Sequence, residues 1–181
     1  MKRFILTGAP GAGKTSILRA LEADGYAVVP EAATDVVASR LALAGAEHWA
    51  EPLFIDRIAA LQRQRREAPV RPGVTVQVHD RSAVCTLALA RYLGQPIPPV
   101  LEQEVAWATG DGSFDRRVFF VRLLGFVERT AVRRISYADS QAFERIHEDS
   151  YRRLGFDLVD VPAGTVAERT AAIRAHIRSW A

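Results

Sequence analysis

The chain has 181 residues, of which 49% are hydrophobic, and it carries 24 basic and 21 acidic side chains. A chain of this length buries roughly 70% of its unfolded surface on folding, so we expect one domain over residues 1–181 and exclude intrinsic disorder. The net charge of only +3 argues against a general nucleic-acid binder, since such domains carry a concentrated basic excess.

The sequence contains no signal for a membrane or an oxidising compartment. No apolar run approaches the roughly 18 residues that a membrane span needs. The apolar run after Lys2 and Arg3 is also too short for a signal peptide. A lone Cys85 cannot form an internal disulfide. We therefore expect a cytoplasmic protein, and its oligomeric state stays open.

Hydrophobic periodicity predicts strands that alternate with helices along the chain. In chain order we expect a strand at 4–6, a helix at 15–21, a strand at 26–29, helices at 31–44 and 52–67, a strand at 74–80, helices at 82–93 and 100–108, a strand at 117–121, two helices within 127–154, a strand at 156–161 and a helix at 165–180. This alternation indicates a parallel sheet of about five strands with helices on both faces, a three-layer α/β/α architecture. In the helix at 52–67 we expect the arginines to face solvent: Arg57, Arg63, Arg65 and Arg66.

Residues 8–15 read GAPGAGKT and match the motif G-x-x-x-x-G-K-S/T in full. A strand is expected before the motif and a helix after it, which is the context that a phosphate-binding loop requires. Glycines let the backbone wrap an anion, and the helix amino end adds about half a positive charge. We therefore expect a nucleoside triphosphate to be bound by these residues and the next one: Gly8, Ala9, Pro10, Gly11, Ala12, Gly13, Lys14, Thr15 and Ser16.

Two side chains of the motif and one distant carboxylate are expected to act on the phosphates and on Mg²⁺. Lys14 should reach the β and γ phosphates, and the hydroxyl of Thr15 should bind the metal ion. Asp80 comes at the end of the strand at 74–80, where a carboxylate can hold Mg²⁺ directly or through water. The alternative role for Asp80 is to cap the following helix, which is worth about 1 kcal/mol.

Three features of the sequence argue against particular classes of protein or site. Arg81 follows Asp80, so the Asp-Glu pair with which many hydrolytic ATPases position water is missing. The chain contains no asparagine, so the Asn-Lys-x-Asp guanine-reading motif of Ras-type GTPases is absent. The four histidines lack the spacing of a metal site, and we expect structural roles for them. Any guanine specificity would have to be achieved in another way, so ATP is the nucleotide that we expect and GTP stays the alternative.

Glu31 stands at the carboxyl end of the second expected strand, the edge that faces the active-site cleft in this architecture. A carboxylate there can accept the proton of an incoming hydroxyl as a catalytic base. It can equally favour the start of the helix at 31–44, and the residues alone leave both roles open.

A basic stretch at about 126–154 suits a helical lid that closes over the phosphates. Arg129 and Arg133 are one helical turn apart, so both can stabilise the charge on the transferred phosphoryl group. The alternative is a solvated helix face whose arginines pair with neighbouring acids. We expect this surface role for three further arginines: Arg145, Arg152 and Arg153.

Four segments occur in the order seen in kinase-type P-loop proteins: the phosphate loop, VPEAA at 29–33, DRS at 80–82 and the basic stretch at 129–134. Over essentially its whole length the chain resembles the predicted ATPase/kinase group related to the nicotinamide-riboside kinase domain of NadR, often labelled an AAA domain. It more distantly resembles deoxynucleoside kinases, in which a base glutamate stands as Glu31 does here and an acidic-Arg-Ser triplet follows the third strand. The resemblance implies the strand order 2-3-1-4-5, the phosphate loop, and Asp80 as the magnesium-side acid.

We therefore expect a small-molecule kinase that transfers the γ-phosphoryl group of ATP to a hydroxyl of a nucleoside-like or other metabolite, with Mg²⁺ as cofactor. Lys14, Arg129 and Arg133 would stabilise the charge of the transition state, and Glu31 would orient or deprotonate the acceptor. The alternative is a nucleotide-controlled binding module or ATPase with slow hydrolysis and a protein or lipid partner. The acceptor is not identified, because the expected acceptor region matches no substrate signature.

Overall fold

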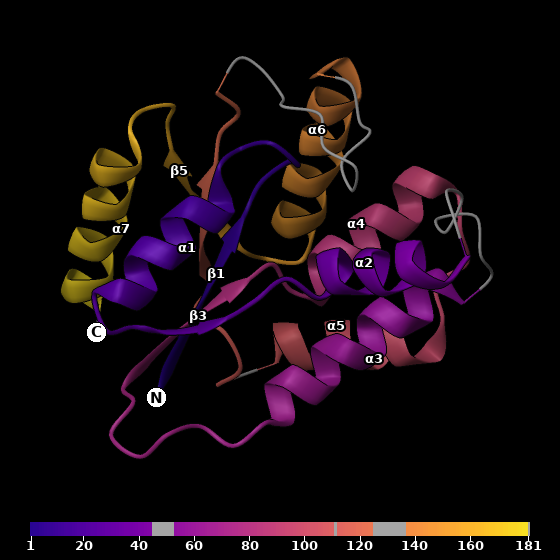
Figure 1. Cartoon of the computed structure of the whole chain (residues 1–181), viewed down its shortest axis with the longest axis horizontal. Coiled ribbons are helices and arrows are strands. Elements are labelled where there is room, and N and C mark those ends of the chain that lie inside the picture. The colour runs from indigo at the N-terminus through magenta and orange to yellow at the C-terminus, as the bar shows by residue number, and fades with distance from the viewer. Residues whose placement is uncertain (45–52, 111, 125–136, 181) are drawn as a thin grey trace.

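Five parallel strands form the centre of the structure, in the spatial order β2-β3-β1-β4-β5 (Figure 1). The computed structural model describes residues 1–44, 53–110, 112–124 and 137–180. The strands are β1 (Lys2–Thr7), β2 (Ala27–Val29), β3 (Val76–Asp80), β4 (Arg117–Val121) and β5 (Asp157–Val161). The observed order is the one that the resemblance to kinase-type P-loop proteins implied.

Helices cover both faces of this sheet and produce three layers (Figure 1). On one face α1 (Lys14–Ala23) packs beside α7 (Val166–Trp180), and on the other α4 (Ala83–Leu93) packs beside α6 (Tyr137–Arg153). A further apolar core joins α4 to three helices: α2 (Ala32–Ala44), α3 (Phe54–Glu67) and α5 (Pro99–Thr109). The three-layer α/β/α class predicted from the alternation of elements is confirmed.

The two sheet faces are built from alternate residues of the same strands, because successive side chains of a strand point to opposite faces. In β1, Phe4 and Leu6 are fully buried in the core with α1 and α7, whereas Ile5 is fully buried in the core with α4 and α6. Burying each such side chain stabilises the folded state by about 1.5–3 kcal/mol. The apolar residues of the strands thus form most of the core, and the phosphate loop and Asp80 lie where β1 and β3 end.

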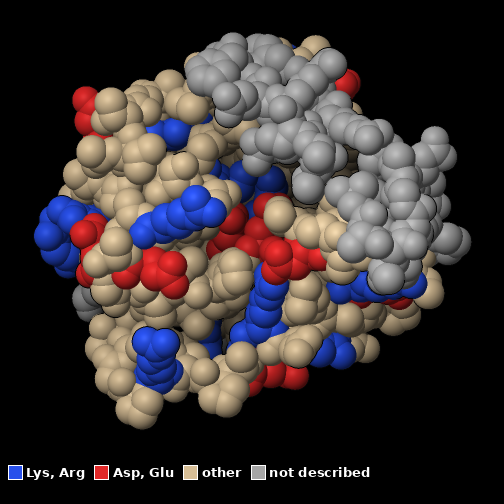
Figure 2. Space-filling view, in the orientation of Figure 1, with Lys and Arg blue, Asp and Glu red and all other residues tan. Residues whose placement is uncertain are grey.

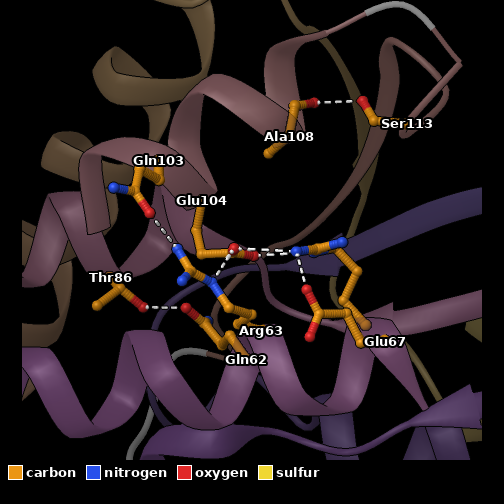
Figure 3. Close-up of polar contacts among 9 residues, drawn as sticks. Gln62, Arg63, Glu67, Thr86, Gln103, Glu104, Ala108 and Ser113 are labelled. Atoms are coloured by element: carbon orange, nitrogen blue, oxygen red, sulfur yellow. Dashed lines mark hydrogen bonds and ion pairs between the residues drawn. The ribbon is translucent and has the colours of Figure 1, made fainter. Parts of the chain in front are cut away.

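Three arginines of α3 are only partly exposed, which corrects the prediction that they face solvent. Arg63 and Arg66 both pair with Glu104 of α5 (Figure 3), and Arg65 pairs with Asp35 of α2. Because α3 lies between α2 and α5, neighbouring helices cover part of its polar side as well as its apolar side. The hydrophobic pattern of one helix reports only the apolar side, so it could not reveal this arrangement.

The other predicted elements are found with their ends shifted by one or two residues at most, as is usual for element boundaries. Of the two helices expected within 127–154, the structure describes one, α6, and residues 125–136 lie outside the described part of the chain. Within the described ranges, no helix has the length and apolar character needed to cross a membrane.

A glycine directly after β1 approaches β4 too closely for any side chain. Gly8 has a φ of +138°, and a Cβ built on it would lie 2.2 Å from the carbonyl oxygen of Val121. No side chain can occupy that space, and only glycine adopts such a φ readily. The chain can therefore turn out of the sheet directly beside the end of β4, which is where the phosphate loop begins.

Replacing Gly8 by alanine should destabilise the fold by about 2–5 kcal/mol, through the clash with Val121 and the backbone strain together. Gly25 is a matched control, since its φ is +92° but a Cβ there would meet no atom within 4 Å. Gly25→Ala should cost only the backbone strain, about 1–2 kcal/mol. Urea denaturation measures both losses, and equal losses would contradict the close approach at Gly8.

Candidate functional site

The polar residues singled out from the sequence meet at one edge of the sheet, where β1, β2 and β3 end. The parallel register pairs Leu6 of β1 with Asp80 of β3, and β2 lies on the other side of β3. The loop at residues 8–13 leaves β1 here, and Glu31 follows β2 here. Figure 2 shows acidic and basic side chains side by side in the middle of the visible surface, between the positions of α1 and α2 in Figure 1. The structure thus brings the loop and both carboxylates together.

The loop leaves the amino end of α1 open to an anion. Gly11 and Gly13 have positive φ angles of +88° and +84°, so the chain curls tightly before the helix. Gly13 is the N-cap of α1 and makes no side-chain bond to the first N–H groups of the helix. Those N–H groups give the helix end about half a positive charge. Thr15 and Ser16 follow in the first turn and are exposed, so this end has the form of a phosphate site.

Lys14 lies folded against the loop. Its side chain is buried, and its Nζ group donates hydrogen bonds to the carbonyls of Gly8 and Ala9 at 3.1 and 3.0 Å. Burial, followed by the nearby guanidinium of Arg81, lowers the pKa of Lys14 to about 8. The amine therefore stays mostly charged at neutral pH, within the loop that is expected to receive the phosphates.

Asp80 is a buried carboxylate with an unsatisfied oxygen. Its Oδ1 atom has no hydrogen-bond partner, and burial raises its pKa to about 6 against the opposing charges of Lys14 and Arg81. The cap of α4 is Ser82, whose hydroxyl accepts the N–H of Val84 at 3.2 Å. The helix-cap role that the sequence left open for Asp80 is therefore filled by another residue. A buried oxygen without a partner calls for a cation or a donor.

Asp80 and Thr15 fit a magnesium site of the P-loop kind. Within the described ranges, no group of three or more Asp, Glu, His or Cys side chains could enclose a metal ion. Mg²⁺ needs no such group, because it keeps several waters and is held by one or two carboxylates together with nucleotide phosphates. The unpartnered oxygen of Asp80 and the exposed hydroxyl of Thr15 are suitable ligands for it.

Glu31 is held by an arginine that follows Asp80 directly. Its Oε1 atom lies 2.5 Å from Nε of Arg81, and the hydroxyl of Thr34 donates to its Oε2 atom at 2.7 Å. Burial tends to raise the pKa of Glu31, but the charges of Arg81 and then Lys14 outweigh it and hold that pKa well below its ordinary value. Glu31 is thus an ionised carboxylate in a fixed position. Among the described non-glycine residues, only Arg81 has a positive φ, +69°.

The same arginine reaches α6 on its other side. Nη1 of Arg81 donates to Nε2 of His147 at 3.0 Å, and Nδ1 of His147 donates to the carbonyl of Phe143 at 3.0 Å. Burial and the Arg81 charge lower the pKa of this fully buried histidine well below its ordinary value, so the ring is neutral. No sequence pattern points to His147, 66 positions from Arg81. The resemblance of the triplet at 80–82 is the one signal that could have indicated Arg81.

A small cavity of about 30 Å³ lies beside Arg81, between β3, α3 and α5. Arg66 and Glu104 form part of its polar wall, and Trp107 contributes an aromatic wall. Glu104 is buried and accepts hydrogen bonds from Nε of Arg66 at 3.0 Å and from Nε of Arg63 at 2.8 Å (Figure 3). The cavity has room for about one water molecule. Asp80 and Arg81 contribute to its lining, whereas residues 8–15 of the phosphate loop do not.

The two arginines predicted to act from the lid, Arg129 and Arg133, lie outside the described residues. The three arginines predicted to lie on the surface are exposed: Arg145, Arg152 and Arg153. One of them, Arg152, pairs with Glu148 one turn earlier on α6 at 2.7 Å. This pair is the solvated-face arrangement that was expected for that part of the stretch.

Comparisons with known proteins agree with this geometry. A family model described as an AAA domain matches residues 3–169. No curated protein sequence matches the chain. Among solved structures, the chain is similar to a deoxyadenosine kinase from M. mycoides that has its products dCMP and a flexible dCDP bound. The sequence identity is 12% and the TM-score is 0.66, and the match covers 99% of this chain and 100% of that one. It is also similar to a thymidylate kinase from Ehrlichia chaffeensis at 15% identity and a TM-score of 0.60, over 98% of both chains. At these identities the likeness shows the fold.

Replacing Asp80 by asparagine should stabilise the ligand-free protein. The pKa of Asp80 rises from the ordinary value of 3.8 to about 6 on folding, so the folded state binds the extra proton and loses stability as the pH rises through this window. Asp80→Asn should match the wild type below about pH 4 and exceed its unfolding free energy by about 1–3 kcal/mol above about pH 7.

Urea denaturation at about pH 4, 6 and 8 measures this difference. Asp24→Asn serves as the control, because Asp24 is a partly exposed carboxylate that pairs with Arg174 on the surface. It should show no such gain at any pH. An Asp80→Asn variant that loses stability above about pH 7 would contradict the cost assigned to the buried charge.

Proposed function

The chain belongs to the AAA domain family, and from this premise we propose that it is an ATP-dependent phosphotransferase. It transfers the γ-phosphoryl group of ATP, or alternatively of GTP, to a hydroxyl of a nucleoside-like or other small metabolite. The observation that carries the proposal is the position of Glu31: an ionised carboxylate held by Arg81 at the same sheet edge as the phosphate loop.

The phosphate loop and Lys14 are proposed to bind the triphosphate. Loop N–H groups and the amino end of α1 face the phosphates. When the triphosphate binds, the Nζ group of Lys14 gives up its hydrogen bonds to the carbonyls of Gly8 and Ala9 and donates to the β and γ phosphate oxygens instead. Phosphate charge favours the protonated amine, so binding should raise the lowered pKa of Lys14. Mg²⁺ bound between the phosphates, Thr15 and Asp80 would neutralise charge on the transferred group.

Glu31 is proposed to orient the acceptor. Its low pKa makes it a weak base but a dependable hydrogen-bond acceptor at neutral pH. A loose phosphoryl-transfer transition state leaves the hydroxyl proton in place until late, so alignment of the acceptor matters more than early deprotonation. Arg129 and Arg133 remain the proposed lid residues that stabilise the charge of the transferred group.

Two observations favour transfer to an acceptor over hydrolysis. A hydrolytic site needs a carboxylate that positions water, whereas the residue after Asp80 is Arg81, which is itself tied to Glu31. The two solved structures that share the fold are named as a deoxyadenosine kinase and a thymidylate kinase. Their names support a nucleoside-like acceptor, which would enter from the side of the cavity between α3 and α5.

An acceptor screen tests the proposal. The protein is incubated with γ-labelled ATP, Mg²⁺ and pools of nucleosides, sugars and antibiotics, and a labelled product is expected with at least one pool. Lys14→Ala should reduce its formation by about 10²- to 10³-fold. Lys2→Ala is the control, because Lys2 is the only other lysine of the chain and lies at the start of β1, at the other end of that strand from the phosphate loop. Label released only as free phosphate, at a rate that no acceptor changes, would instead indicate a nucleotide-controlled binding module.

Glu31→Gln should lower the turnover number by about 10²-fold while ATP affinity changes by less than about twofold. The amide keeps the shape of the side chain but loses the charge that aligns the hydroxyl. Initial-rate kinetics with the acceptor found in the screen, together with ATP titration calorimetry, separate the two effects. Glu22→Gln, on the exposed side of α1, is the control. Undiminished turnover in Glu31→Gln would remove Glu31 from the mechanism.

A further inference from the structure

An arginine from the last helix is buried against the phosphate loop. Arg169 of α7 is 4% exposed. Its Nη1 group donates to the carbonyl of Ala12 at 2.8 Å, and its Nη2 group donates to the carbonyl of Arg122 at 2.9 Å. Nη1 also lies 3.2 Å from the position that a Cβ on Gly13 would occupy. One guanidinium group thus joins the phosphate loop to the chain that leaves β4.

The charge of this guanidinium group is not neutralised within the described residues. No carboxylate there forms an ion pair with Arg169, and its buried Nε atom has no hydrogen-bond partner. Burial lowers the pKa of Arg169, as expected for a cation held only by carbonyl dipoles. Burying an unpaired charge is unfavourable, and packing alone does not require it. An apolar side chain would pack against α1 as Ile173 and Ile177 do.

The bond to Ala12 also sets the direction of one loop N–H group. The carbonyl and the N–H of a trans peptide point in opposite directions. Arg169 holds the Ala12 carbonyl, so the N–H of Gly13 in the same peptide points away from Arg169. Gly13 is the N-cap of α1, and the first N–H groups of a helix are where an anion is received. The contact therefore acts on the part of the loop that would bind phosphate.

We propose that Arg169 is a positioning residue for the nucleotide. It holds the Ala12–Gly13 peptide with its N–H toward the phosphates, and it supplies a fixed positive charge behind the loop. This inference rests on the nucleotide binding proposed above. It goes beyond that proposal because Arg169 lies 157 positions from Ala12 and outside the phosphate-loop motif. The phosphates attract this charge without touching it, so its effect should grow with their number.

Titration calorimetry with ATP, ADP and AMP, each in the presence of Mg²⁺, tests the proposal. Arg169→Gln should weaken ATP binding by about tenfold and AMP binding much less, because the variant loses the charge and the donor fork. Arg169→Lys should recover most of the ATP affinity, since it restores the charge. Arg174→Gln is the control, because Arg174 lies on the same helix and pairs with Asp24 away from the loop; it should bind all three nucleotides as the wild type does.

The possible results separate this inference from the proposed function. Wild-type protein that binds no nucleotide would overturn the proposed function and the inference together. Wild-type protein that binds ATP, with Arg169→Gln binding it equally well, would overturn the inference alone. Equal losses for ATP and AMP without recovery in Arg169→Lys would also overturn it, because they would indicate a packing role.

A measurement on the unaltered protein keeps the test independent of whether the variants fold. In ¹⁵N-labelled wild type, the Nε–H signal of Arg169 and the amide signal of Gly13 should shift together as ATP is added. The midpoints of both shifts should equal the calorimetric dissociation constant. ATP binding that moves other loop amides but leaves both of these signals unchanged would contradict the proposal.

Discussion

The parallel pairing of β1 with β3 decides where the polar side chains of this protein meet. It sets Leu6 beside Asp80, so the turn that begins at Gly8 and the carboxylate that ends β3 are neighbours. The central strands bury apolar residues on both faces of the sheet, and the polar residues of this site lie at the strand ends. The ends of β1, β2 and β3 each add one component to a single edge, and the close approach of Gly8 to Val121 fixes the point at which the loop leaves it.

The charges gathered at this edge are arranged at a cost to stability. Lys14 is held by loop carbonyls, and Asp80 keeps a buried oxygen without a partner. Arg169 is buried without a described carboxylate. None of these groups has the partner that would stabilise it best in the ligand-free protein. A bound triphosphate with its metal ion would interact favourably with these charges, so binding would recover part of this cost.

Arg81 connects the sheet edge that carries the candidate site to the rest of the molecule. It pairs with Glu31 after β2 and donates to His147 on α6, the helix that follows residues 125–136. Beside the small cavity, Glu104 ties α5 to α3 through Arg63 and Arg66 (Figure 3). The position of Glu31 is therefore coupled to α6, and the wall of the neighbouring cavity depends on the contact between α3 and α5.

Local signals in the sequence were enough for the fold class and for the loop at residues 8–15. The strand and helix periods span only two to four positions, and the loop motif is contiguous, so both can be read without tertiary information. The strand order came from resemblance to a family. The direction of the α3 arginines needed the structure, because the neighbouring helices α2 and α5 decide it. The cap role considered for Asp80 also needed the structure, in which Ser82 caps α4 instead.

Only the tertiary structure revealed His147 beside Arg81 and Arg169 beneath Ala12. These contacts join residues 66 and 157 positions apart, and each is a single polar contact that leaves no period in the sequence. A buried histidine or arginine looks, in one dimension, like any other polar residue on a helix. Its partner is determined by how the helices pack on the sheet.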